Sequence, residues 1–157
     1  MSQSSNIELF KGDLPPGRFA AKAIAVDTET LGLNPHRDRL CLVQLSDGDG
    51  TAALVQVSPD DDATELKRLL ADESVLKIFH YARFDVAVLK HALGVDTAPI
   101  YCTKIASKLA RTYTDRHGLK DLCRDLLGIE VSKQQQSSDW GAEMLSPEQL
   151  SYAASEV

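Results

Sequence analysis

Apolar residues along this chain fall into short runs separated by turn residues, which is the pattern of buried β-strands. Residues 40–45 and 52–57 are two such runs, and an Asp-Gly-Asp-Gly turn at 47–50 joins them. Turns of this composition connect antiparallel strands, so we expect a hairpin here. Further apolar runs predict three more strands, over residues 22–27, 75–80 and 100–102.

Helical spacing of apolar residues begins after the hairpin. Leu66, Leu69 and Leu70 share one face of a predicted helix over residues 64–71. The same spacing predicts helices over residues 83–93, 104–111 and 119–127, with Gly94 and Gly128 as C-terminal caps of the first and the last.

This order of elements predicts an α/β domain whose mixed sheet is flanked by helices. The length of 157 residues suits one domain. Residues 1–18 are polar and contain Pro15-Pro16-Gly17, so we expect a loosely attached lead-in there. Residues 19–157 would then form the domain.

Composition narrows the function classes. A net charge of −6 argues against a large surface for non-specific duplex binding, although metal ions could still hold a short nucleotide substrate. Cys41, Cys102 and Cys123 lack metal-ligand spacing and are interpreted as reduced thiols of a cytoplasmic protein. No apolar run reaches the length of a membrane span, and the N-terminus lacks a signal pattern, so we expect no membrane partner.

Two carboxylates, Asp27 and Glu29, lie at the end of the first predicted strand. Because side chains alternate along a strand, both point to one side and Thr28 points away. Like charges in a buried place need a positive partner, and carboxylate oxygens suit Mg²⁺ or Mn²⁺. The alternative is that Asp27 caps the strand and Glu29 is a solvated loop residue. Taken alone, the pair favours that alternative.

A third carboxylate, Asp85, falls in the first turn of the helix that follows His80. This position is at the rim where the strands of α/β sheets end and where their sites form. The helix dipole would by itself also favour an acidic residue there.

The end of the chain carries a strong helix start. Ser146 suits the N-cap, Pro147 suits the first helical position, and Gln149 completes a capping box. Tyr152 and Glu156 lie four residues apart and share a face of this helix. A phenol beside a carboxylate could orient an attacking water. The alternative is a half-buried tyrosine beside a surface glutamate.

The polar segment 132–140 lacks periodicity and holds Trp140, the only tryptophan. Its composition suits contact with phosphates and stacking on a base. It equally suits a linker held in place by Trp140, and the sequence does not decide between the two.

In combination, these residues resemble the DEDDy group of 3′–5′ exonucleases: Asp27-x-Glu29 on a strand, Asp85 after His80, and Tyr152 with an acid four residues on. The resemblance extends over residues 12–157. It includes segments 117–122, 138–140 and 150–155, which are similar to ribonuclease D, and segments 34–40 and 102–109, which are more similar still to NrnC-type small exoribonucleases.

The resemblance implies a ribonuclease H-like (DnaQ-like exonuclease) fold and two divalent metal ions, Mg²⁺ or Mn²⁺, as cofactors. It implies metal binding and catalysis by Asp27, Glu29, Asp85 and Glu156, the last of which occupies the place of an aspartate in the family. Tyr152 matches the residue that positions the attacking water. The residues assigned to substrate binding are Thr28, Leu31 and His80.

The implied activity is hydrolysis of short single-stranded RNA, dinucleotides especially, to nucleoside 5′-monophosphates from the 3′ end. Ring-shaped homo-oligomers are implied as well. One alternative is a ribonuclease D-like exonuclease that acts on longer RNA or on DNA. Another is an oligonucleotide-binding protein with weakened catalysis.

Two departures from the family pattern lead to further expectations. Glu156 is one methylene longer than the family's aspartate, so we expect weakened catalysis, with a loss on the order of 10²-fold. The chain stops one residue later, where the family continues. We therefore expect a shortened domain whose last helical turn is frayed.

Overall fold

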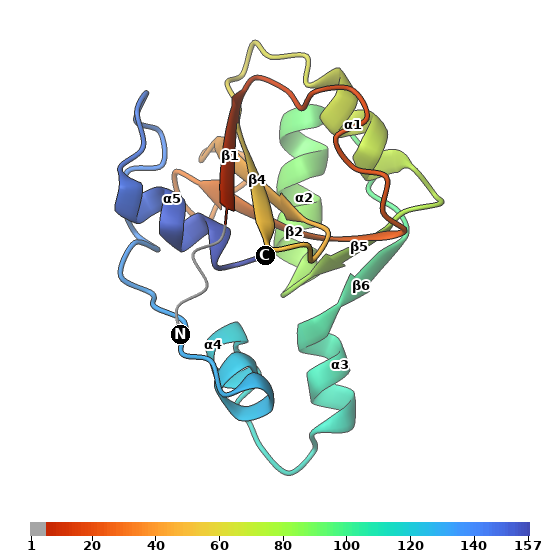
Figure 1. Cartoon of the computed structure of the whole chain (residues 1–157), viewed down its shortest axis with the longest axis vertical. Helices are drawn as coiled ribbons and strands as arrows, with labels where there is room; N and C mark the ends of the chain where they lie inside the picture. The colour runs from red at the N-terminus through yellow and green to blue at the C-terminus, as the bar shows by residue number, and fades with distance from the viewer. Residues whose placement is uncertain (1–5) are drawn as a thin grey trace.

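The computed structural model describes residues 6–157 and contains a six-stranded mixed sheet with helices on both faces (Figure 1). The strand order is β1-β4-β3-β2-β5-β6. Strand β3 pairs antiparallel with β2 and β4, and the remaining pairs are parallel. The strands are β1 (Asn6–Lys11), β2 (Ala23–Thr30), β3 (Leu40–Ser46), β4 (Thr51–Gln56), β5 (Leu76–Phe79) and β6 (Ile100–Cys102).

The predicted helices are present. They are α1 (Thr64–Ala71), α2 (Ala82–Leu93), α3 (Thr103–Ala110), α4 (Leu119–Leu122) and α5 (Pro147–Ala154). Helix α4 continues into a wider π-helical turn, η1 (Cys123–Leu127), where we predicted one regular helix. No residue of α4 or η1 is buried, so packing does not impose a single helical repeat on this segment.

The sheet separates two apolar layers. On one face, the buried leucines of α1 and the inner face of α2 pack on residues such as Ile24 and Val26 of β2. On the other face, Trp140 and α5 pack on β3 and β4. Alternation along β2 directs Asp27 and Glu29 away from the α1–α2 layer, toward the side of α5.

The expectation of a loosely attached lead-in over residues 1–18 is wrong from Asn6 onward; residues 1–5 lie outside the described part. Strand β1 adds to the sheet by parallel pairing with β4. The carboxylate of Asp13 then accepts hydrogen bonds from the first-turn amides of Glu65 and Leu66, at 2.9 and 2.8 Å, and caps α1 from a distance. Leu14 is buried in the core. Because β1 is a half-exposed edge strand, its residues are partly polar, and the sequence shows no apolar run there that would predict a strand.

Helices α3 and α4 extend beyond the end of the sheet at the bottom of Figure 1. Salt bridges hold this region together: Arg111, at the end of α3, reaches Asp125 of η1 at 2.7 Å. Within residues 6–157, no helix has the length and apolar character needed to cross a bilayer.

Candidate active site

The acidic pair lies on β2 itself, because this strand continues to Thr30 rather than ending at residue 27. Gln44 of β3 is the register partner of Asp27. Its buried amide group donates to Asp27 Oδ2 at 3.1 Å and lies 3.5 Å from Glu29 Oε1. One side chain of the neighbouring strand therefore holds both carboxylates on the same side of the sheet, as the alternation predicts.

The third acid, Asp85, is joined to β2 through Thr28. The Thr28 hydroxyl donates to Asp85 Oδ1 at 2.6 Å, and both residues are buried. Thr28 does point away from Asp27 and Glu29, and for that reason it meets α2, where Asp85 occupies the first turn. One face of β2 thus carries Asp27 and Glu29, and the other face holds Asp85 in place through Thr28.

Helix α5 and the turn that follows it complete the cluster. The predicted capping box is present: the Ser146 hydroxyl accepts from the Gln149 amide at 3.1 Å, and Gln149 Oε1 accepts from the Ser146 amide at 2.9 Å. The Tyr152 ring packs against Trp140, with 5.9 Å between ring centroids. Glu156 lies in the turn just after α5, not on it, yet its charge acts on both acids of β2.

Burial and mutual repulsion raise the pKa values of these carboxyls. Burial, followed by the charges of Asp85, Glu29 and Glu156, raises the pKa of Asp27 well above its usual range. Burial raises the pKa of Glu29 to about 8 and that of Asp85 to about 7. Burial also raises the pKa of Glu156. The four carboxyls therefore resist being ionised together, and a bound cation would relieve that repulsion.

The phenol of Tyr152 remains protonated beside this cluster. Burial raises its pKa above the ordinary value, and the charges of Glu156, Glu29 and Asp27 add to the effect. A neutral phenol can donate a hydrogen bond to a carboxylate or to a water molecule.

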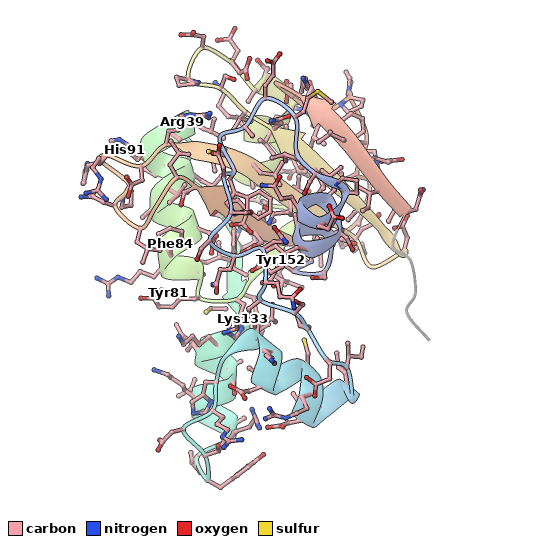
Figure 2. All side chains as sticks on the ribbon, turned by 90° about the vertical axis from the view of Figure 1, so that its left-hand side faces the viewer. Arg39, Tyr81, Phe84, His91, Lys133 and Tyr152 are labelled. Carbon is pink, nitrogen blue, oxygen red and sulfur yellow. The ribbon has the colours of Figure 1, made fainter. Side chains whose placement is uncertain are left out.

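The acids open into a cleft of about 910 Å³. Its walls come from the ends of β2 and β5, the starts of α2, α3 and α4, segment 131–138 and the end of the chain from Tyr152 onward. Figure 2 shows Tyr81 and Phe84 on the α2 side of this region, with Tyr152 and Lys133 opposite. Three lysines, Lys104, Lys120 and Lys133, also line it. The cleft therefore offers cations for phosphates next to acids for metal ions.

The residues assigned to substrate binding lie at the cleft but differ in what they can contact. The Leu31 side chain is exposed, and 53% of the residue surface is accessible. Thr28 is buried and its hydroxyl is already bonded to Asp85. His80 Nδ1 lies 2.9 Å from the Thr103 hydroxyl, and burial lowers the pKa of the ring. Of the three, Leu31 is free to touch a ligand directly.

Within residues 6–157, no three His, Cys, Asp or Glu side chains are grouped closely enough to form a ready metal centre. The donor set still fits a hard divalent cation, since it consists of carboxylate oxygens whose ionisation is opposed only by burial and by one another. The buried side-chain Oε1 of Gln44, whose Nε2 donates to Asp27, has no hydrogen-bond partner in the described part of the chain. The residues present therefore fit divalent metal ions.

Segment 132–140 is a linker held by its tryptophan. Trp140 is 1% exposed and donates from Nε1 to the Gln136 carbonyl at 3.4 Å. Stacking of Trp140 on a base is therefore wrong, because the ring is enclosed in the core of the α5 face. The same segment does bring Lys133 and Ser138 to the cleft.

Sequence reasoning missed Gln44, Tyr81 and Lys104. Gln44 did carry a signal, since it is the one polar residue in the apolar run 40–45. Neither Tyr81 nor Lys104 stands out in the sequence, because only the fold places the start of α2 next to the start of α3.

Comparison with known proteins agrees with this geometry. The family model described as "3'-5' exonuclease" matches residues 18–157. Ribonuclease D of Gluconacetobacter diazotrophicus is 34% identical over 134 residues, which are 85% of this chain and 34% of that protein. The chain thus spans about a third of the length of the curated ribonuclease D relatives it matches.

Two solved structures of one relative are covered over three quarters of their length. NrnC of Brucella melitensis bound to pGG is 58% identical, with a TM-score of 0.93 over 98% of this chain and 76% of that one. The same protein with bound Mg²⁺ is 56% identical, with a TM-score of 0.91 over 97% and 75%. Escherichia coli RNase D, described as an exoribonuclease involved in structured RNA processing, is 30% identical, with a TM-score of 0.76 over 88% and 36%. The predicted DnaQ-like fold is confirmed, and the chain belongs to the 3′–5′ exonuclease family, together with ribonuclease D and NrnC.

Proposed function

We propose that this protein is a metal-dependent 3′–5′ exoribonuclease that hydrolyses short oligoribonucleotides, dinucleotides in particular, to nucleoside 5′-monophosphates. The observation that carries the proposal is the convergence of Asp27, Glu29, Asp85 and Glu156 with Tyr152 at a lysine-lined cleft. Family membership supplies the reaction class.

In this proposal the four carboxylates would hold two divalent ions, Mg²⁺ or Mn²⁺, and these would supply the charge neutralisation and Lewis acidity that phosphodiester hydrolysis needs. A relative with bound Mg²⁺ supports the choice of cation. Gln44 keeps Asp27 and Glu29 in place, and Thr28 does the same for Asp85.

The remaining groups of the cleft act on the substrate. Tyr152, held by Trp140 and kept protonated, orients the attacking water through its phenol. Lys120 and Lys133 offset the charge of the phosphates. Leu31, at the exposed end of the strand, packs against the terminal nucleotide.

Two observations support a short substrate. The cleft volume is in the range of pockets that enclose small ligands, about 300–1,000 Å³. The net charge of −6 offers little attraction for a long duplex outside the cleft. The pGG complex of the Brucella relative is consistent with both.

We also propose a homo-oligomer. Large apolar side chains are exposed along the region of α3, α4 and η1, and they would be covered by a second copy of the chain. They are Ile105, Leu109, Tyr113, Leu126 and Leu127. Sedimentation of the purified protein tests this proposal, and a monomer at micromolar concentration contradicts it.

The test of the activity is hydrolysis of a 5′-phosphorylated diribonucleotide, compared with a 20-nucleotide RNA and the matching DNA, with Mg²⁺, Mn²⁺ or EDTA. We expect cleavage of the diribonucleotide that requires metal. Preferential cleavage of the long RNA would instead favour a ribonuclease D-like activity.

Glu156 decides how strong the activity is. Its charge acts on the acids of β2, so we expect metal binding to be retained, while its extra methylene displaces the oxygens relative to aspartate. We expect Glu156→Asp to raise the rate by about 10²-fold. Substrate binding without cleavage in both proteins would identify a binding protein in place of an enzyme.

A further inference from the structure

Tyr81, at the start of α2, has a backbone conformation that tyrosine rarely adopts. Its φ is 67° and its ψ is 52°, in the left-handed region. Glycine or asparagine would adopt this conformation at a lower cost in free energy. Its side chain forms no capping hydrogen bond to the helix, so capping does not explain a tyrosine here. The ring itself is therefore the feature to explain.

The Tyr81 ring lies in the cleft and is supported from one side. Lys104 of α3 places its ammonium 4.5 Å from the ring centroid, a cation–π contact. Within residues 6–157, no carboxylate lies within salt-bridge distance of this ammonium. Even so, 47% of the surface of Tyr81 is exposed, so the ring is not a core residue. One ring face is thus supported and the rest is available to a ligand.

The position of Tyr81 relative to the acids indicates which part of a substrate would contact the ring. Tyr81 lies four residues before Asp85, and both residues line the cleft. A dinucleotide whose phosphodiester reaches the acids can therefore place a nucleobase against the same wall. Aromatic rings next to a cation stack on bases, and the contact is larger for purines than for pyrimidines.

We propose that Tyr81 is a specificity-determining residue, a platform on which one base of the substrate stacks, with Lys104 fixing the ring from behind. This inference rests on the proposed function for the identity of the substrate. It predicts that the protein binds dinucleotides with a purine at the stacked position more tightly than those with a pyrimidine.

The test is equilibrium binding of pApA, pApC, pCpA and pCpC, with Ca²⁺ in place of Mg²⁺ to prevent turnover. Wild type, Tyr81→Phe and Tyr81→Asn are compared. The phenylalanine variant should keep the affinity and the purine preference. The asparagine variant should bind about 10-fold more weakly and lose the preference at one of the two positions. With Mg²⁺, the change should lie mainly in KM.

Thermal unfolding separates this role from a structural one. Asparagine tolerates the left-handed conformation, which favours the variant, but it loses the cation–π contact with Lys104, which favours wild type. The two effects oppose each other, so the melting temperature of Tyr81→Asn should lie within about 4 °C of that of wild type. Ala63 is the matched control, because it is also left-handed, with φ 45°, before α1 and does not line the cleft. Ala63→Gly should leave dinucleotide binding unchanged.

The possible results distinguish a failure of the Tyr81 inference from a failure of the proposed function. The inference is overturned if Tyr81→Asn keeps the affinity and the base preference of wild type. It is also overturned if the affinity falls together with a melting temperature that drops by clearly more than about 4 °C, since the ring would then serve the fold. Dinucleotides that bind to wild type but are not cleaved contradict the proposed function, while the comparison of variants still tests the platform. Absence of dinucleotide binding to wild type overturns both.

Discussion

Two regions of this protein differ in whether their carboxyl groups have basic partners, and the pKa values of those carboxyls shift in opposite directions. In the region of α3 and η1, Asp125 pairs with Arg124 and Arg111, and those hydrogen bonds lower its pKa. At the end of β2, the carboxyls of Asp27, Glu29 and Asp85 lie close together and form no salt bridge with a basic residue within residues 6–157, and burial raises their pKa values. The first arrangement stabilises the fold. The second costs stability in the absence of a cation, and such costs mark functional sites.

The largest expected effect comes from removing one charge of the acidic cluster. Asp27→Asn should reduce metal-dependent hydrolysis by about 10³-fold, since a group that stabilises the transition state is lost. The metal-free protein should be at least as stable as wild type, because one repelling charge is gone. Single-turnover kinetics and thermal unfolding in EDTA measure the two effects. Unchanged turnover would remove Asp27 from the active site.

Gln44 tests whether the acids need their amide partner. Gln44→Leu keeps the approximate volume but deletes the donor to Asp27 and Glu29, and the amide lowers the pKa of Glu29. We expect Mg²⁺ affinity at pH 7 to fall about 10–100-fold, as for other partners of metal-binding side chains. The deficit should shrink at higher pH, where both acids ionise regardless. Titration calorimetry at pH 7 and pH 9 provides the comparison, and an equal deficit at both would contradict this account.

The two regions also predict different pH dependence of stability. In the metal-free protein, Glu29 and Asp85 bind protons more tightly when folded, with pKa values of about 8 and 7. The folded state then holds more protons than the unfolded state, so their contribution to stability falls as pH rises from about 4 toward 8. For Asp125 the sign is reversed, and its contribution is lost as pH falls below about 4.

Thermal unfolding in EDTA from pH 5 to 8 checks this difference. Glu29→Gln should flatten the decline that wild type shows, and added Mg²⁺ should oppose it most at high pH. Asp125→Asn should leave the slope in this interval unchanged. A wild-type melting temperature that rises over the interval would refute the assigned direction.

The sequence predicted those elements that depend on local interactions and missed one that depends on a distant interaction. Helix α1 was predicted with its observed bounds because three leucines at helical spacing define its buried face. The α5 capping box is also local and was predicted. Strand β1 was missed because it is stabilised by pairing with β4, and the paired residues, such as Asn6 and Thr51, are 45 positions apart in the sequence.

At the site, the spacing of Asp27 and Glu29 and the position of Asp85 could be derived from strand alternation and helix placement. Their grouping with Tyr152 and Glu156 came from resemblance to a family. The contacts between strands and helices that hold the acids, through Gln44 and Thr28, required the fold. The same is true of the Tyr81–Lys104 contact.

The smallest expected effect on chemistry comes from the paired charges. Asp125→Asn removes the acceptor of Arg111, a guanidinium that also donates to the Arg116 carbonyl and joins α3 to η1. We expect a lower melting temperature but a kcat within about twofold of wild type, because the pair lies outside the cleft. Asp115→Asn, which removes an acid of the same region that forms no salt bridge within residues 6–157, is the matched control and should change neither quantity. A loss of kcat in Asp125→Asn at temperatures where the protein remains folded would show that the α3–η1 region acts on the acids, and the contrast between the two regions would then fail.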